Sequence, residues 1–143
     1  ACIAPVEECT NGVFVINASI AGVGIVTEPV KLTVRNGVIE LIEGGNDADL
    51  LESIFTMHDN PNCFRISELG IGLNPNAIPC GTLLEDEAPL GTVHIAAGNN
   101  ASNFPGGQVS APLHIDMIAK DATLYIDDIM LLKDGVFQDE ALD

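Results

Sequence analysis

Two histidines and an aspartate have the residue types and the spacing that metal binding requires. His114 and Asp116 are two positions apart in an apolar run, and alternate residues of an extended strand point to the same face. His94 lies in a second apolar run, and a glycine-rich loop between the runs can bring it to the pair. Two imidazoles and a carboxylate are suitable ligands for Zn²⁺ or another first-row metal. The same pair also fits a solvated ion pair on an open sheet face, and the spacing leaves both interpretations open.

The composition is that of a folded and strongly acidic chain. Its 143 residues fit one domain, 47% of them are hydrophobic, and five Lys and Arg against 21 Asp and Glu give a net charge of −16. This charge argues against nucleic-acid and anionic-membrane partners, because both need a basic surface. No run of about 18 apolar residues is present, so we expect no membrane span. The first residue is Ala1, from which we expect a processed, proteolysed or truncated N-terminus.

The four cysteines predict at least one disulfide. Pairing of neighbours along the chain closes short loops, and such a loop stabilises a fold by about 2–3 kcal/mol. The predicted pair is Cys2 with Cys9 or Cys63 with Cys80.

Two Asn-Ala-Ser tripeptides, at Asn17 and Asn100, are acceptors for N-glycosylation if the chain is exported. Together with an even number of cysteines they slightly favour an extracellular location. The alternative is a cytoplasmic protein with four reduced thiols, and the sequence leaves it open.

Short strands make up most of the elements that must position the histidines. Alternating runs at 30–35 and 38–43 flank Asn36-Gly37, which predicts a hairpin. Apolar residues at helical spacing predict one clear helix at 46–58. In all, about nine short strands and one helix predict a β-dominated α+β fold in a single domain, residues 1–137, followed by an acidic tail at 138–143.

A series of motifs in one order resembles the C-terminal, metal-bearing half of the aminopeptidase T family of metallopeptidases. More loosely, it is similar to a related iron-dependent, ring-cleaving dioxygenase of dihydroxypyridine breakdown. The motifs are ELGIGLN at 68–74, LEDE at 84–87, GTVHIA at 91–96, GG at 106–107, HID at 114–116 and DGVF at 134–137.

The resemblance implies a centre of one or two divalent ions, either Zn, Co, Mn or Fe. Four of the family's five ligands match residues of this chain, and the fifth, a glutamate, would precede Cys2. Three carboxylates are remote candidates for a general base. The matched ligands are Glu68, His94, His114 and Asp116, and the remote carboxylates are Glu85, Asp86 and Glu87.

Three functions follow as hypotheses. The first is a metal-dependent aminopeptidase domain that removes N-terminal residues from peptide substrates, incomplete or inactive as this chain. The second is an extracellular, self-assembling structural protein, of filament or sheath type, that keeps the fold without catalysis. The third is a mononuclear iron dioxygenase site formed by His94, His114 and Asp116. We also expect the chain to form a homo-oligomer or polymer, because one helix covers few of its apolar strands.

Overall fold

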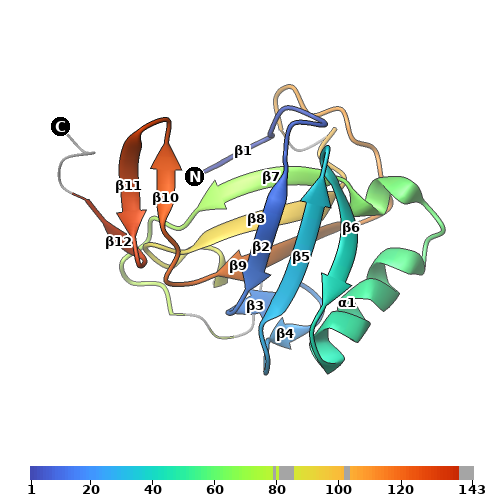
Figure 1. The fold of residues 1–143 in the computed structure, drawn as a ribbon, viewed down its shortest axis with the longest axis horizontal. Helices are drawn as coiled ribbons and strands as arrows, with labels where there is room; N and C mark the ends of the chain where they lie inside the picture. The colour runs from blue at the N-terminus through green and yellow to red at the C-terminus, as the bar shows by residue number, and fades with distance from the viewer. Residues whose placement is uncertain (79, 81–85, 102–103, 139–143) are drawn as a thin grey trace.

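The computed structural model describes residues 1–78, 80, 86–101 and 104–138, which contain one α-helix and twelve strands in three sheets (Figure 1). This confirms the predicted β-dominated fold with one clear helix. The strands outnumber the predicted nine for two reasons. The run at 13–20 divides into strands of two different sheets, and the N-terminal segment adds a two-residue strand. The proposed tail lies outside the described residues apart from Gln138, and the domain boundary at 137 stays a prediction.

The largest sheet has six strands, and its three long central strands pair antiparallel with one another. Its middle strand is buried at all six positions, so both faces of the sheet are covered there. The strands, in sheet order, are β1 (Cys2–Ile3), β7 (Ile66–Ile71), β8 (Val93–Gly98), β9 (His114–Ala119), β3 (Ser19–Ile20) and β4 (Gly24–Ile25).

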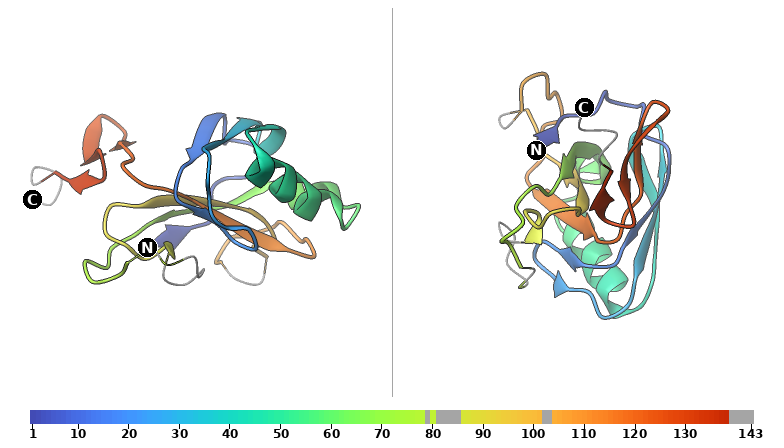
Figure 2. Two further views of the ribbon diagram at one scale, coloured as in Figure 1. Left: turned by 90° about the horizontal axis from the view of Figure 1, so that it is seen from below. Right: turned by 90° about the vertical axis from the view of Figure 1, so that its left-hand side faces the viewer.

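A second sheet packs across one face of the first, as the two views of Figure 2 show. It consists of β2 (Gly12–Ile16), β5 (Val30–Arg35) and β6 (Val38–Glu43). Alternate residues of β5 are buried, as its apolar-polar alternation predicts. Asn36 and Gly37 have φ of 49° and 75°, which confirms the predicted hairpin turn between β5 and β6.

The hydrophobic core fills the space between these two sheets and α1 (Asn46–Thr56). Leu32 of β5, Phe55 of α1 and Met117 of β9 are completely buried in it, as is Cys63 of the short 3₁₀ helix η1 (Pro61–Phe64). Burial of this apolar surface is the main force that holds the layers together. Ile95 and Ala97 of β8 point into the core, so the residues that alternate with them, His94 and Ala96, face the other side.

The helix is two residues shorter than predicted. Gly45 is its N-terminal cap and makes no side-chain capping bond, while the Asp47 carboxylate in the first turn accepts hydrogen bonds from the amide and hydroxyl of Thr27 at 2.7 and 2.8 Å. At the other end Asp59 has a φ of 46°, which turns the chain away, and His58 is exposed beyond the helix. No helix within the described ranges is long and apolar enough to span a membrane.

A third, small sheet projects from the rest of the fold (Figures 1 and 2). It is formed by β10 (Leu124–Ile126), β11 (Ile129–Lys133) and β12 (Val136–Phe137). Several of its apolar side chains are more than half exposed, namely those of Tyr125, Ile126, Ile129 and Val136.

The predicted disulfides are not formed, since no bond joins any of the four cysteines, all of which lie among the described residues. Cys63 is buried in the core whereas Cys80 lies exposed in a loop, where its amide is bonded to Asp86. Cys2 is fixed in β1 by pairing with Gly70, so the closeness of two cysteines in sequence did not bring them together.

Glycosylation of Asn17 and Asn100 stays a prediction, and the structure argues against it at Asn100, which is 1% exposed and hydrogen-bonded inside the fold. The Asn17 side chain donates to the Lys120 carbonyl at 3.2 Å and accepts from the Lys120 amide at 2.8 Å. This pair occupies the Asn17 carboxamide and argues against a glycan there as well.

Candidate metal centre

The four predicted ligands lie together on the face of the large sheet that points away from the core. Ala96 of β8 is paired with Glu68 on one neighbouring strand and with Asp116 on the other. Paired residues point to the same face, so the methyl group of Ala96 forms a floor between two carboxylates. His94 lies two positions before Ala96, and His114 is paired with the residue two positions after it. The two imidazoles therefore approach this floor from opposite ends.

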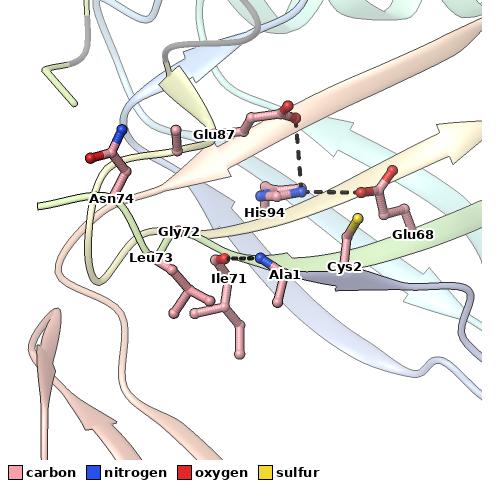
Figure 3. A pocket seen from close by; sticks show the side chains of 10 residues that line it. Ala1, Cys2, Glu68, Ile71, Gly72, Leu73, Asn74, Glu87 and His94 are labelled. Atoms are coloured by element: carbon pink, nitrogen blue, oxygen red, sulfur yellow. Dashed lines mark hydrogen bonds and ion pairs between the residues drawn. The ribbon is translucent and has the colours of Figure 1, made fainter. Parts of the chain in front are cut away.

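The distances within the cluster are short. The His114 Nε2 atom lies 3.0 Å from Glu68 Oε2 and 3.4 Å from Asp116 Oδ1. His94 Nε2 is 3.3 Å from Glu68 Oε1 (Figure 3). One ligand atom from each of Glu68, His94 and Asp116 lies within 4.8 Å of the other two, and these three residues are at most 4% exposed. Side chains from three strands thus converge on one buried point.

Two glycines of the ELGIGLN motif make this approach possible. A side chain at Gly70 would collide with the imidazole of His94, with which Gly70 is paired across β7 and β8. A side chain at Gly72 would collide with the Pro89 carbonyl and the Thr92 hydroxyl. Glycine is therefore needed for close packing of the next strand, independently of any special backbone conformation.

Hydrogen bonds set the charges of the cluster. Burial alone raises the pKa of Glu68, but hydrogen bonds from His114 and His94 outweigh it and lower that pKa to about 2. Hydrogen bonds to Asp116 and Glu68 raise the pKa of His114 to about 10, against the opposing effect of burial. In the metal-free protein, an imidazolium at His114 therefore compensates the charge of the carboxylates near neutral pH.

The outer nitrogen of His114 is fixed by the backbone. Nδ1 lies 2.7 Å from the Asn99 carbonyl oxygen, which can only accept, so Nδ1 carries the proton and Nε2 faces the cluster. The Phe104 ring stacks on the imidazole at a centroid distance of 6.3 Å and an interplanar angle of 29°. Both contacts come from the loop after β8.

Unpartnered atoms show that the cluster suits a metal. Asp116 Oδ1 is buried, and its 3.4 Å contact with His114 Nε2 is an ion pair without good hydrogen-bond geometry. His94 Nδ1 is also buried and makes no hydrogen bond with any described group. A buried polar atom without a partner costs about 1–3 kcal/mol, and a carboxylate oxygen more. A cation held by imidazole and carboxylate would satisfy Asp116, so the donor set and its orientation fit a divalent metal.

A cavity of about 400 Å³ opens beside the cluster, with Glu68 and His94 in its wall (Figure 3). The Glu87 carboxylate lies across it, with Oε2 3.9 Å from His94 Nε2. Burial first, and then the negative charge of Asp116, raise the pKa of Glu87. Cys2 also lines the cavity, and its thiol hydrogen-bonds to Glu68.

The three remote carboxylates predicted as candidates for a general base lie in different places. Glu87 lies at the cavity, Asp86 is 2% exposed and accepts from the Cys80 amide at 2.7 Å, and Glu85 lies outside the described residues. No sequence periodicity predicts that Glu87 lies near His94. The turn at Gly91, with a φ of 84°, determines how the two side chains are placed. Cys2 and Asn74 were missed as cavity residues for the same reason: their positions follow from strand pairing and a loop.

A sheet face with two histidines and two carboxylates beside a cavity is characteristic of metalloenzymes. Residues 1–139 match the profile of the 2,5-dihydroxypyridine 5,6-dioxygenase (NicX) family, and the chain belongs to this family.

Two comparisons lead to Pseudomonas putida KT2440. The chain is 27% identical over 125 residues to its 2,5-dihydroxypyridine 5,6-dioxygenase, a match that covers 80% of this chain and 35% of that protein. The solved structure of 2,5-dihydroxypyridine dioxygenase from the same organism superposes with a TM-score of 0.86 and 24% identity, over 95% of this chain and 42% of the other. The second comparison shows a shared fold, and the chain corresponds to well under half of either relative.

The assignment to the aminopeptidase T family is therefore wrong, and with it the prediction of a peptide-hydrolysing metallopeptidase. The looser similarity to a dihydroxypyridine dioxygenase pointed to the right family. The error has a physical reason, since the motifs specify strand packing and metal-type side chains, as Gly70 and Gly72 show, and do not specify a reaction. A dioxygenase family implies a metal, and the structure contains a His, Glu and Asp group suited to hold one.

Proposed function

We propose that this chain provides the metal-binding part of a dioxygenase that opens a dihydroxylated, nitrogen-containing aromatic ring, with 2,5-dihydroxypyridine as the first substrate to test. The observation that carries the proposal is the convergence of Glu68, His94 and Asp116 on one buried point in a chain of the dioxygenase family, with His114 Nε2 only 3.4 Å from Asp116 Oδ1. The names of the relatives suggest the substrate.

The metal we propose is ferrous iron. Two histidines and one carboxylate on one side of the ion, with the remaining positions open, are the ligand set of non-haem iron oxygenases. His94, His114 and Asp116 would form this set, and Glu68 would be a further ligand or a hydrogen-bond acceptor beside it. Bound there, Fe²⁺ supplies the oxygen chemistry that amino-acid side chains lack.

The protein groups prepare the site for a cation. His114 must release its Nε2 proton when a metal binds, while its Nδ1 proton stays on the Asn99 carbonyl. Glu68, whose pKa is about 2, stays ionised throughout and offers negative charge. Because the cluster is buried, these charges act with little screening by water.

The cavity gives the site a place for a small ring. Its volume of about 400 Å³ is within the range of about 300–1,000 Å³ of small-molecule sites. Ile71 and Leu73 line it with apolar surface, and Asn74 and Glu87 add polar groups (Figure 3). We infer that Glu87 accepts a hydrogen bond from a ring hydroxyl and so orients the ring relative to His94.

Oxygen uptake by the protein that contains this chain tests the proposal. After anaerobic loading with Fe²⁺, addition of 2,5-dihydroxypyridine and air should consume one O₂ per ring lost, followed by an oxygen electrode and ultraviolet absorbance. Loading with Zn²⁺ is the matched control and should give no uptake. Stoichiometric binding of Fe²⁺ without oxygen uptake on any dihydroxylated ring would contradict the reaction, and release of amino acids from peptides would contradict the class.

A further inference from the structure

Asn100 is a buried amide that does not reach the cavity yet connects two parts of the metal centre. It is 1% exposed, and its side chain hydrogen-bonds to the backbone at two points. Nδ2 donates to the Ser67 carbonyl at 2.9 Å, and Oδ1 accepts from the Val109 amide at 2.9 Å. A carboxamide is needed for this pair of bonds, since it offers a donor and an acceptor side by side.

One of the two bonds joins the loop after β8 to β7, a strand that carries a ligand. Ser67 immediately precedes Glu68 on β7, so one bond anchors Asn100 beside a ligand. Asn99 immediately precedes Asn100, and its carbonyl accepts the Nδ1 proton of His114 at 2.7 Å. The Asn100 side chain therefore helps to fix the loop after β8 to β7 at the point where that loop holds His114, beside the backbone bonds from Gly98 to Arg65 and from Asn99 to Leu113.

The surrounding loop is packed onto Asn100. The Asn100 amide bonds to the Val109 carbonyl at 2.9 Å, and the Phe104 amide bonds to the Asn100 carbonyl at 3.2 Å. A side chain at Gly107 would collide with the carbonyl and side-chain oxygens of Asn100. Phe104, which stacks on His114, belongs to the same loop, so two contacts of that imidazole depend on where the loop sits.

We propose that the Asn100 carboxamide is a positioning residue for the metal centre. Through the Asn99 carbonyl it holds the His114 ring with Nδ1 protonated and Nε2 directed at Glu68 and Asp116. This proposal rests on the proposed function, because it assumes that the cluster binds a metal. The hydrogen bond from His114 Nδ1 to the Asn99 carbonyl forms in the metal-free protein. Groups that orient a metal-bound histidine in this way commonly contribute 10–100-fold to metal affinity.

The test compares Asn100→Ala with Asn17→Ala. Asn17 is a matched control, because its side chain also donates to and accepts from the backbone, at Lys120, beyond the far end of β9 from His114. Two readouts are taken on each variant. One is the Kd for Co²⁺, a spectroscopic substitute for Fe²⁺, and the other is the ¹H–¹⁵N signal of His114 Nδ1–H in the metal-free protein.

The expected result is a 10–100-fold weaker Kd for Co²⁺ in Asn100→Ala, with loss or fast exchange of the His114 Nδ1 proton. Asn17→Ala should lower the melting temperature while its Kd stays within about threefold and its Nδ1–H signal persists. Asn100→Ala with wild-type affinity and an unchanged Nδ1–H signal would overturn the proposal.

Two further measurements keep the outcomes separate. If Asn100→Ala does not fold, Asn100→Asp retains the acceptor for Val109 and replaces the donor to Ser67 by a charged acceptor, and it should show the same two effects. If that variant also fails to fold, the scalar coupling across the hydrogen bond between His114 Nδ1–H and the Asn99 carbonyl decides in the wild type, and its absence overturns the proposal. A wild type that binds no metal but shows this coupling would refute the proposed function alone.

Discussion

The two faces of strand β8 bury their side chains equally well and for different purposes. Ile95 and Ala97 enter the hydrophobic core, where the surrounding side chains are apolar. His94 and Ala96 are equally hidden on the opposite face, but there the neighbours are carboxylates and imidazoles. Apolar side chains buried against one another indicate a structural role, whereas buried polar atoms that lack a hydrogen bond of good geometry, such as Asp116 Oδ1, indicate a ligand. Mutations on the two faces should therefore separate stability from metal binding.

The largest effect is expected on the polar face. His114→Ala should abolish metal binding, because it removes one imidazole and the group that hydrogen-bonds to Glu68. In the wild type, saturating Fe²⁺ at about 100 times its Kd should stabilise the fold by about 2.7 kcal/mol, which a chelator reverses. The variant should melt at the same temperature with metal and with chelator, and a chelator-sensitive melting temperature in it would contradict the assignment of His114.

The next effect separates two adjacent residues of β9. Met117 is completely buried in the core, so Met117→Ala should lower the free energy of unfolding by about 2–5 kcal/mol and leave the metal Kd nearly unchanged. Asp116→Asn should do the opposite, with a large loss of metal affinity and a smaller change in metal-free stability. Urea unfolding measures the stability of both variants, and Co²⁺ titration measures their metal affinity. Equal losses of affinity in the two variants would contradict the separation of a core face from a metal-binding face.

Gly70→Ala tests whether packing around His94 shapes the site. Its methyl group would occupy the space of the imidazole, so His94 must move and the metal Kd should rise at least tenfold. Circular dichroism of the metal-free variant is the control, because a native spectrum shows displacement of the ring and not unfolding. A variant with wild-type affinity would show that His94 is not held where the structure places it.

The stability of the metal-free protein should depend on pH through His114 and Glu68. The His114 pKa is raised from 6.5 to about 10, so its contribution is complete below pH 6.5 and is lost as the pH rises towards 10. The Glu68 pKa is lowered from 4.5 to about 2, so its contribution is complete above pH 4.5 and is lost as the pH falls towards 2. These two groups together favour maximal stability between pH 4.5 and 6.5. In His114→Ala the decline on the alkaline side should be smaller, and an unchanged pH profile of urea unfolding would contradict the pKa of His114.

The smallest effect concerns self-association, which stays a prediction. The β10–β12 sheet exposes Tyr125, Ile126 and Ile129, and a net charge of −16 opposes contact between copies. Added salt screens this repulsion over about 8–10 Å and should shift the chain towards oligomers. Light scattering of wild type and Ile129→Lys, with and without sodium chloride, measures it, and a wild-type monomer at high concentration and high salt would contradict it.

The sequence predicted structure well where the structure depends on the spacing of residues close together in the chain. The spacing of His114 and Asp116 predicted that they share a face, and Asn36-Gly37 predicted a hairpin that the structure contains. The remaining site residues depend on contacts between distant segments. Glu87 reaches the cavity through a turn, and Asn100 acquires its role only when the loop after β8 folds onto β7. No local sequence pattern predicts such contacts between distant segments. The tripeptide at Asn100 therefore suggested only a glycosylation acceptor.

The predicted disulfides and the family assignment failed for a similar reason. Loop length measures how easily two cysteines could meet, but strand pairing decides where they are, as Cys2 in β1 shows. The extracellular location, which rested partly on these cysteines, stays a prediction. The motifs around Gly70 and Gly72 describe a scaffold that places metal ligands, so they predicted the position of the centre better than its chemistry.

Anomalous diffraction at the iron edge from crystals loaded anaerobically with Fe²⁺ tests the central claim most directly. We expect one strong peak on the polar face of the sheet, within coordination distance of Nε2 of His94, Nε2 of His114 and a carboxylate oxygen of Asp116. A peak elsewhere, or none in crystals whose protein retains stoichiometric iron in solution, would contradict it.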